Sequence, residues 1–180
     1  MRDRAGEDFA EALICSHRHP AISEADDIYA PLLGSWTVAT RDVLDDGSEV
    51  LGEGEWIFGR VLDGRGVQDV WIAPARKDRA TAPRHPRERY GSSMRTFDPG
   101  SGRWQVTWFN PVSGAFDVLH ARVEDGRIVQ VGSGSTGDSI EWIFEHIGPT
   151  DFRWVGRSRS RDGEWRLNAE FVGRRTSSNG

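Results

Sequence analysis

Eight tryptophans, spread along almost the whole 180-residue chain, constrain its fold more than any other feature. Each lies in or beside a short run in which apolar and polar residues alternate, and Gly, Asp, Asn or Pro residues bound nearly every run. Alternation with a period of two places such side chains on one face of a β-strand. The chain therefore predicts many short strands around an aromatic interior, which is either a packed core or a pocket.

Turn-forming residues divide the chain after Gly34 into about ten expected strands. Pairs such as Asp63-Gly64 and Asp125-Gly126 favour hairpin turns, because Gly, Asn and Asp tolerate positive φ. Successive hairpins make a meander, and closing the sheet removes its exposed edges. We therefore expect an all-β fold, an antiparallel up-and-down barrel of about ten strands with a short N-terminal helical segment. The strands are expected near residues 34–43, 49–61, 65–73, 90–97, 103–109, 115–123, 127–136, 139–147, 152–160 and 164–173.

The N-terminal region is expected to be helical rather than extended. Phe9, Leu13 and Ile14 fall on one helical face within residues 6–16, and Ser23 is placed to cap a second helical turn. Three regions follow from this division: a partly disordered helical extension over 1–27, the barrel over 28–173, and a disordered tail over 174–180.

Composition narrows the class of protein. The chain has 23 basic and 28 acidic residues, a net charge of −5, which does not favour nucleic acid or an anionic membrane as partner. Lys77 is the only lysine, a bias that a GC-rich bacterial genome would produce. Cys15 is the only cysteine, so no disulfide forms within the chain. The acidic N-terminus lacks a signal-peptide pattern, and no run approaches the ~20 apolar residues of a membrane span, so we expect a cytoplasmic protein.

The stretch Leu32-Leu33-Gly34-Ser35-Trp36, which follows a short helix and precedes a ten-strand meander, resembles the Gly-x-Trp start of the calycin superfamily. Lipocalins, intracellular fatty-acid-binding proteins and nitrobindin-like barrels belong to that superfamily, and the likeness covers residues 28–173. In lipocalins the tryptophan closes one barrel end and packs against an arginine from the last strand. The resemblance thus implies barrel-end closure by Trp36 with Arg166, or with Arg174 as the other matching position.

A nitrobindin-like interpretation would imply haem bound by a histidine near the C-terminus. The strand expected over 164–173 contains no histidine, and His120 and His146 lack motif support as substitutes, so we expect no cofactor. Cys15, His17 and His19 lack a fourth ligand, so we expect no metal site either.

A literal GxGxxG motif spans residues 132–137. A dinucleotide-binding motif leads into a helix, whereas the residues that follow here alternate as a strand. The glycines are better explained by strand bending or by close packing of a neighbouring element.

The alternation also predicts which side chains face inward, and a ten-strand barrel is wider than side chains readily fill. A cavity is therefore favoured over the alternative of a filled core. Asp69, His120, Arg122 and His146 are the polar exceptions on the expected inner face. The ligand-binding residues expected there are Trp56, Phe58, Asp69, Trp71, Met94, Trp104, Trp108, His120, Arg122, Trp142 and Trp154.

Three functions fit this pattern. The first is binding of a small, largely apolar or aromatic ligand in a tryptophan-lined cavity. The second is a cofactor-free isomerase, cyclase or hydrolase that uses His120 or Asp69 as general acid or base. The third is a structural or partner-binding barrel without a ligand. A homodimer could form through outward-facing apolar residues, namely Ile57, Ile72, Phe97 and Phe109.

The connection over residues 75–89 is the only one too long for a hairpin, with six basic and two acidic residues. We expect it to lie over one mouth of the barrel and to attract an anionic ligand group through Arg84, Arg87 or Arg89. The alternative is a solvated connector with no further role.

Overall fold

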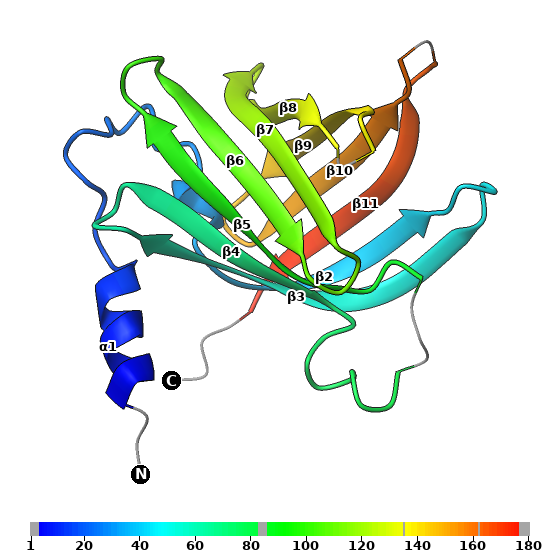
Figure 1. Ribbon diagram of the computed structural model, residues 1–180, viewed down its shortest axis with the longest axis horizontal. Coiled ribbons are helices and arrows are strands. Elements are labelled where there is room, and N and C mark those ends of the chain that lie inside the picture. Colours follow the sequence, from blue (N-terminus) through cyan, green and yellow to red (C-terminus); the bar gives the residue numbers. More distant parts are fainter. Residues whose placement is uncertain (1–3, 83–85, 135, 162, 177–180) are drawn as a thin grey trace.

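A computed structural model describes residues 4–82, 86–134, 136–161 and 163–176. Ten antiparallel strands form a closed barrel, with one short strand and a short helix at the N-terminal side (Figure 1). The expected fold class is confirmed. The elements are α1 (Arg4–Leu13), β1 (Ile14–Cys15), the 3₁₀ helix η1 (Ala30–Leu32), β2 (Gly34–Val43), β3 (Glu49–Val61), β4 (Gly66–Ala73), β5 (Arg89–Asp98), β6 (Arg103–Asn110), β7 (Ala115–Glu124), β8 (Arg127–Ser133), β9 (Ser139–Ile147), β10 (Asp151–Arg159) and β11 (Arg166–Arg175).

The barrel is an up-and-down meander. Each strand from β2 to β11 pairs with the next in sequence, and β11 pairs with β2 to close the sheet. Turn chemistry sets the strand ends: Glu124 faces Arg127 across a two-residue loop in which Asp125 and Gly126 have φ values of 50° and 75°. That conformation is the one a tight hairpin requires. β1 adds to the end of β3 through Ile14–Val61 pairing.

The N-terminal region differs in detail from the helical expectation. The first helix spans Arg4–Leu13 rather than 6–16. Ser23 accepts a hydrogen bond from the Asp26 backbone N–H at 3.1 Å, as a cap would, but the chain continues as turns. Only Ala30–Leu32 is helical there. Among the described residues, no helix is long and apolar enough to cross a membrane.

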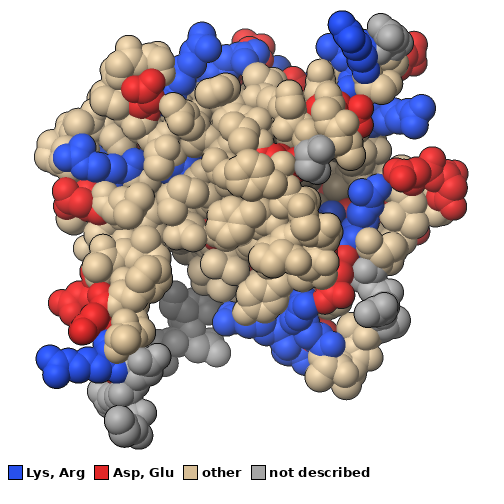
Figure 2. Space-filling view, in the orientation of Figure 1, with Lys and Arg blue, Asp and Glu red and all other residues tan. Residues whose placement is uncertain are grey.

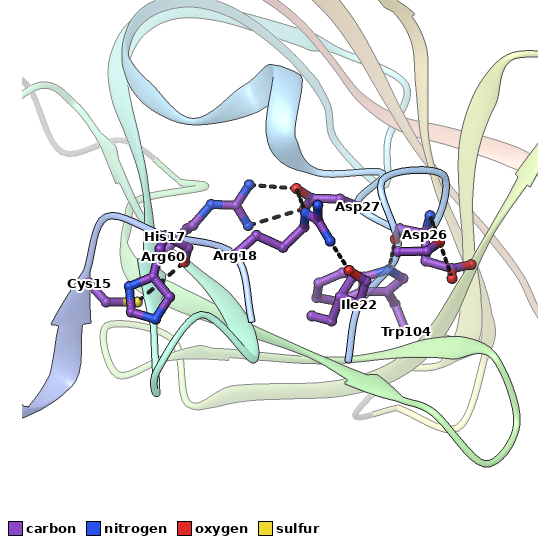
Figure 3. Close-up of polar contacts among 9 residues, drawn as sticks. Cys15, His17, Arg18, Ile22, Asp26, Asp27, Arg60 and Trp104 are labelled. Atoms are coloured by element: carbon purple, nitrogen blue, oxygen red, sulfur yellow. Dashed lines mark hydrogen bonds and ion pairs between the residues drawn. The ribbon is translucent and has the colours of Figure 1, made fainter. Parts of the chain in front are cut away.

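The chain before β2 packs over one end of the barrel. Ile22, Tyr29 and Leu32 are buried in the core cluster, and the Tyr29 ring meets Trp104 edge-on at 5.1 Å between centroids. The Trp104 indole N–H donates to the Asp26 carbonyl at 2.7 Å (Figure 3). This end of the barrel is therefore filled by side chains.

A buried ion pair fastens the same segment to the barrel wall. Arg60 of β3 donates to both carboxylate oxygens of Asp27, at 3.2 and 2.5 Å (Figure 3). Arg18 lies 3.8 Å from the Asp27 carboxylate and donates to the Ile22 carbonyl. Moving the segment away from the wall would separate Asp27 from Arg60 and leave a buried charge uncompensated, which is costly. These contacts therefore hold the segment in one position.

Trp36 closes this end with an arginine that the sequence analysis did not select. Arg175, directly opposite Trp36 in the β2–β11 register, stacks on the indole at 4.1 Å from its centroid. It also donates to the carbonyls of Pro31, Leu33 and Pro149. The prediction that Arg166 is the partner of Trp36 is wrong, because Arg166 begins β11 and Arg175, at the other end of that strand, meets Trp36.

Candidate functional site

A cavity of about 530 Å³ occupies the opposite end of the barrel. Its rim is built from the turns that join β2 to β3, β4 to β5, β6 to β7 and β8 to β9, represented by Asp45, Arg87, Ser113 and Thr136. Because β2 begins at the closed end and finishes at this rim, the cavity and the Trp36 closure lie at opposite ends. A volume of this size suits a small organic molecule.

Six aromatic side chains line the cavity, together with many polar residues. Trp154 stacks on Phe171 at 4.5 Å between centroids, with an angle of 8° between the planes. The Trp56 and Trp71 rings lie 5.0 Å apart, and Trp142 links Trp154 at 6.1 Å to Trp108 at 6.5 Å. The aromatic lining residues are Trp56, Trp71, Trp108, Trp142, Trp154 and Phe171.

Glycines allow two of these indoles to lie close to the strands. A Cβ at Gly91 would come within 2.5 Å of the Trp108 ring, and a Cβ at Gly156 within 2.5 Å of the Trp154 ring. Larger residues at these positions would push the rings into the cavity. The space inside the barrel therefore depends on small residues placed beside large ones.

Polar groups gather at the base of the cavity. Arg95 of β5 donates to Asp69 of β4 at 2.6 Å, with both side chains essentially inaccessible to solvent. The second Asp69 oxygen accepts from the Ser93 backbone N–H at 2.9 Å. The Arg95 guanidinium also lies over the rings of Tyr29 and Phe58, at 5.0 and 5.4 Å from their centroids. The arginine is thus held rigidly, and its charge is compensated.

Tyr29 orients a second polar side chain at the base. Burial raises the pKa of Tyr29 above its ordinary value, so the phenol keeps its proton. Its O–H donates to Gln130 Oε1 at 3.0 Å. With that oxygen engaged, the Gln130 amide group has its Nε2 left over as a donor.

Four buried nitrogen donors have no hydrogen-bond partner among the residues that the structure describes: Trp56 Nε1, Trp71 Nε1, Arg95 Nε and Gln130 Nε2. All four side chains line the cavity. An unsatisfied buried group costs about 1–3 kcal/mol, so a cluster of them calls for an explanation. All four of these unpartnered groups are donors, and none is an acceptor.

The rim carries paired charges. Arg89 donates to both oxygens of the fully buried Asp42, and its guanidinium lies 5.1 Å from the Phe171 centroid. Arg87 lies 3.4 Å from Asp45. Five acidic and three basic residues line the whole cavity, so its charge balance does not favour an anion.

The expected mouth loop partly meets this description. Arg87 and Arg89 lie at the cavity rim as expected, whereas Arg84 lies outside the described residues. The start of the connection is anchored, because Arg76 forms an ion pair with Glu55 at 2.7 Å and Ala75 is buried.

Of the expected ligand-binding residues, five line the cavity: Trp56, Trp71, Trp108, Trp142 and Trp154. Phe58 and Trp104 are buried in the packed part of the barrel. Asp69 is buried behind Arg95 and does not itself line the cavity. The remaining three are Met94 of β5 and His120 and Arg122 of β7. Their positions depend on which alternate residues of these two strands face the barrel interior.

The inward orientation expected for His120 and Arg122 is wrong. Directly opposed residues of antiparallel strands share a face, and the inward-facing Trp104 and Val106 oppose Ala121 and Leu119. His120 and Arg122 therefore lie exposed on the outside. The expectation placed the larger apolar residues of β7 inside, whereas small inward residues leave room for neighbouring indoles. His120 is thus not placed to act on a molecule in the cavity.

In β5, too, the alternate residues that face inward are the opposite set from the one expected. Ser93 and Arg95 face inward and line the cavity, while Met94 is half-buried on the other face. Sequence reasoning preferred methionine to arginine in the interior, which is the usual distribution. Asp69 could have indicated that Arg95 faces inward, because a buried carboxylate needs a partner. Arg95 is a basic residue on the next strand that can share a face of the sheet with Asp69.

A β-bulge explains why His146 does not face inward as expected. The β9–β10 register shifts between Arg153 and Trp154, so Phe144 faces inward while His146 is exposed and lies 3.5 Å from Asp151. No group of three or more His, Cys, Asp or Glu side chains within the described ranges could hold a metal ion.

The expected outer apolar patch is not formed as proposed. Ile72 is buried, and Phe97 packs against the core at 5.6 Å from Trp104. Phe109 of β6 is exposed as expected, and Phe116 and Val118 of the neighbouring β7 are exposed as well. Figure 2 shows a broad area without charged side chains on the face where these strands lie in Figure 1. Dimerisation stays a prediction.

Solved structures with a similar fold include the following two. Rv2717c from M. tuberculosis matches with a TM-score of 0.58 and 14% identity, over 89% of this chain and 100% of that one. The structure of EF1p2_mFAP2b bound to DFHBI matches with a TM-score of 0.35 and 15% identity, over 84% and 98%. The first likeness concerns the fold alone, and the second is too distant to support an argument. No family model matches the chain, and no curated protein is significantly similar to it.

Proposed function

We propose that the protein binds a small, largely apolar or aromatic molecule inside the barrel. The observation that carries this proposal is the cavity of about 530 Å³ with five tryptophans in its wall. Large aromatic surfaces with a few placed polar groups are the usual composition of a ligand pocket. The closed end and the open rim give such a ligand one route of access.

The proposal includes membership of a calycin-like group of barrels. Its support is the Gly34-x-Trp36 start of β2 together with Arg175 from the last strand stacked on Trp36. Such a tryptophan–arginine closure is what the resemblance implies. A cytoplasmic location stays a prediction of the sequence.

The enzymatic alternative has less support. Its candidate bases were His120, which is exposed on the outer face, and Asp69, which is paired with Arg95 at 2.6 Å. No observation favours catalysis over binding.

Intrinsic tryptophan fluorescence tests the proposal, because any molecule in the cavity contacts several indoles. The protein is titrated with flavone, pyrene and palmitate, beside an Ala169→Phe variant that fills the cavity. Ala39→Phe is the matched control, since Ala39 is exposed on the outer face of β2 while Ala169 lines the cavity.

We expect a saturable change with at least one compound in the wild type and in Ala39→Phe. In Ala169→Phe the Kd should rise by at least about tenfold. Saturable binding unaffected by Ala169→Phe, or no saturable response to any compound, would contradict the proposal. Near-ultraviolet circular dichroism confirms that each variant is folded.

A further inference from the structure

The four unpartnered donors in the cavity lining say more about the ligand than its aromatic wall does. Trp56, Trp71, Arg95 and Gln130 each line the cavity and are at least nine-tenths buried. Each contributes a nitrogen donor without a partner among the described residues. Since every one of these orphan groups is a donor, the missing partner is an acceptor.

Their side chains form one connected group. Trp71 lies beside Trp56, which lies 5.1 Å from Phe58, and Arg95 sits over the Phe58 ring. Tyr29 then links Arg95 to Gln130 through its ring and its hydroxyl. In this structure the nitrogens are covered by neighbouring atoms. A ligand oxygen therefore reaches one of them after a side-chain rotation, of the kind that is common on binding.

The charge of that acceptor follows from the ion pairs. Asp69 compensates Arg95 at the base, while Asp42 compensates Arg89 at the rim. A carboxylate at the base would bring a second negative charge to a guanidinium that already has one. With acidic residues in excess around the cavity, an uncharged oxygen fits better.

We propose that the cavity base binds the carbonyl oxygen of a neutral, planar aromatic ketone or related carbonyl compound, with its rings against the tryptophan wall. This inference rests on the proposed function and specifies its ligand class. The tryptophan and glutamine donors supply the hydrogen bonds, and Tyr29 orients Gln130. The charge of Arg95 is compensated by Asp69, so it does not attract an anion.

Three naphthalene probes of nearly equal shape test this assignment by isothermal titration calorimetry at pH 7. They are 2-acetylnaphthalene, 2-isopropenylnaphthalene and 2-naphthoate, which present a carbonyl, a methylene and a carboxylate at the same place. We expect 2-acetylnaphthalene to bind about tenfold tighter than the isopropenyl compound, and 2-naphthoate to bind most weakly.

Variants locate the preference. In Trp71→Phe the ratio of the two neutral affinities should fall toward one, while Trp154→Phe, which removes an indole from the same wall, should keep it. If Trp71→Phe does not fold, Gln130→Glu serves instead, because it keeps an oxygen for Tyr29 and removes the amide donor.

The outcomes separate this inference from the proposed function. Equal binding of the acetyl and isopropenyl probes would overturn the donor assignment and leave ligand binding intact. Tightest binding of 2-naphthoate would overturn the assignment of a neutral ligand. An unchanged ratio in the donor variants would also overturn it, and binding of none of the probes would count against both proposals.

Discussion

At the scale of single residues, the ion pair between Asp69 and Arg95 should dominate the stability of the cavity base. Asp69→Asn leaves the guanidinium charge without its partner in a site closed to solvent. We expect the free energy of unfolding to fall by about 3–5 kcal/mol. Glu124→Gln, which breaks the exposed Arg122–Glu124 pair, should cost less than about 1 kcal/mol. Urea denaturation measures both, and equal effects would show that the buried pair has no special role.

Arg175 should stabilise the closed end of the barrel through the planar geometry of its guanidinium group rather than through its charge. It stacks on Trp36 and donates to three backbone carbonyls, contacts that a lysine cannot reproduce together. We expect Arg175→Lys to destabilise the protein by about 1–3 kcal/mol in urea denaturation. Arg174→Lys, at the exposed neighbouring position, should be nearly neutral. A neutral Arg175→Lys would refute the closure described here.

At the scale of elements, the pairing of β7 with β8 depends on the absence of a side chain at Gly132. A Cβ there would lie 2.0 Å from the Val118 carbonyl oxygen, so the strands would have to separate. We expect Gly132→Ala to destabilise by at least about 1–3 kcal/mol. Gly59→Ala on β3, where a Cβ meets nothing within 4 Å, is the control and should be neutral or slightly stabilising. Thermal melts that rank the two variants equally would contradict this account.

Strand positions were predictable because local chemistry determines them. Asp-Gly and related turn residues favour positive φ whatever the rest of the chain does, so β2, β3 and β9 begin and end where expected. Side-chain direction was less predictable. The parity of β7 depends on its register against β6, and the position of His146 depends on a bulge between β9 and β10. Both are set by pairing between strands.

The residues of the candidate site likewise divide into those that local patterns predict and those that depend on pairing between strands. The cavity tryptophans were found because alternation places large aromatics inward. Arg95, Gln130 and Tyr29 were missed because their burial depends on partners from other strands, which composition does not indicate. Arg175 was missed because the last strand runs two residues further than expected.

For the molecule as a whole, half-buried carboxylates that pair with arginines should make stability depend on acid pH. The hydrogen bond from Arg153 lowers the pKa of Glu170 below its ordinary 4.5, and Arg76 does the same for Glu55. A pKa lowered in the folded state stabilises above the ordinary pKa, and this contribution is lost as pH falls through the lowered value. We therefore expect Tm to decline below about pH 4.5, and to decline less steeply in Glu170→Gln. Parallel Tm curves for both proteins would refute the role of Glu170.

A crystal structure of the protein grown with saturating 2-acetylnaphthalene tests the central claim most directly. The account predicts the naphthalene between Trp71, Trp142 and Trp154, with its carbonyl oxygen at the base within hydrogen-bond distance of the Trp71 or Gln130 nitrogen. A barrel interior filled by its own side chains, with the probe bound only on the outer surface, would contradict it.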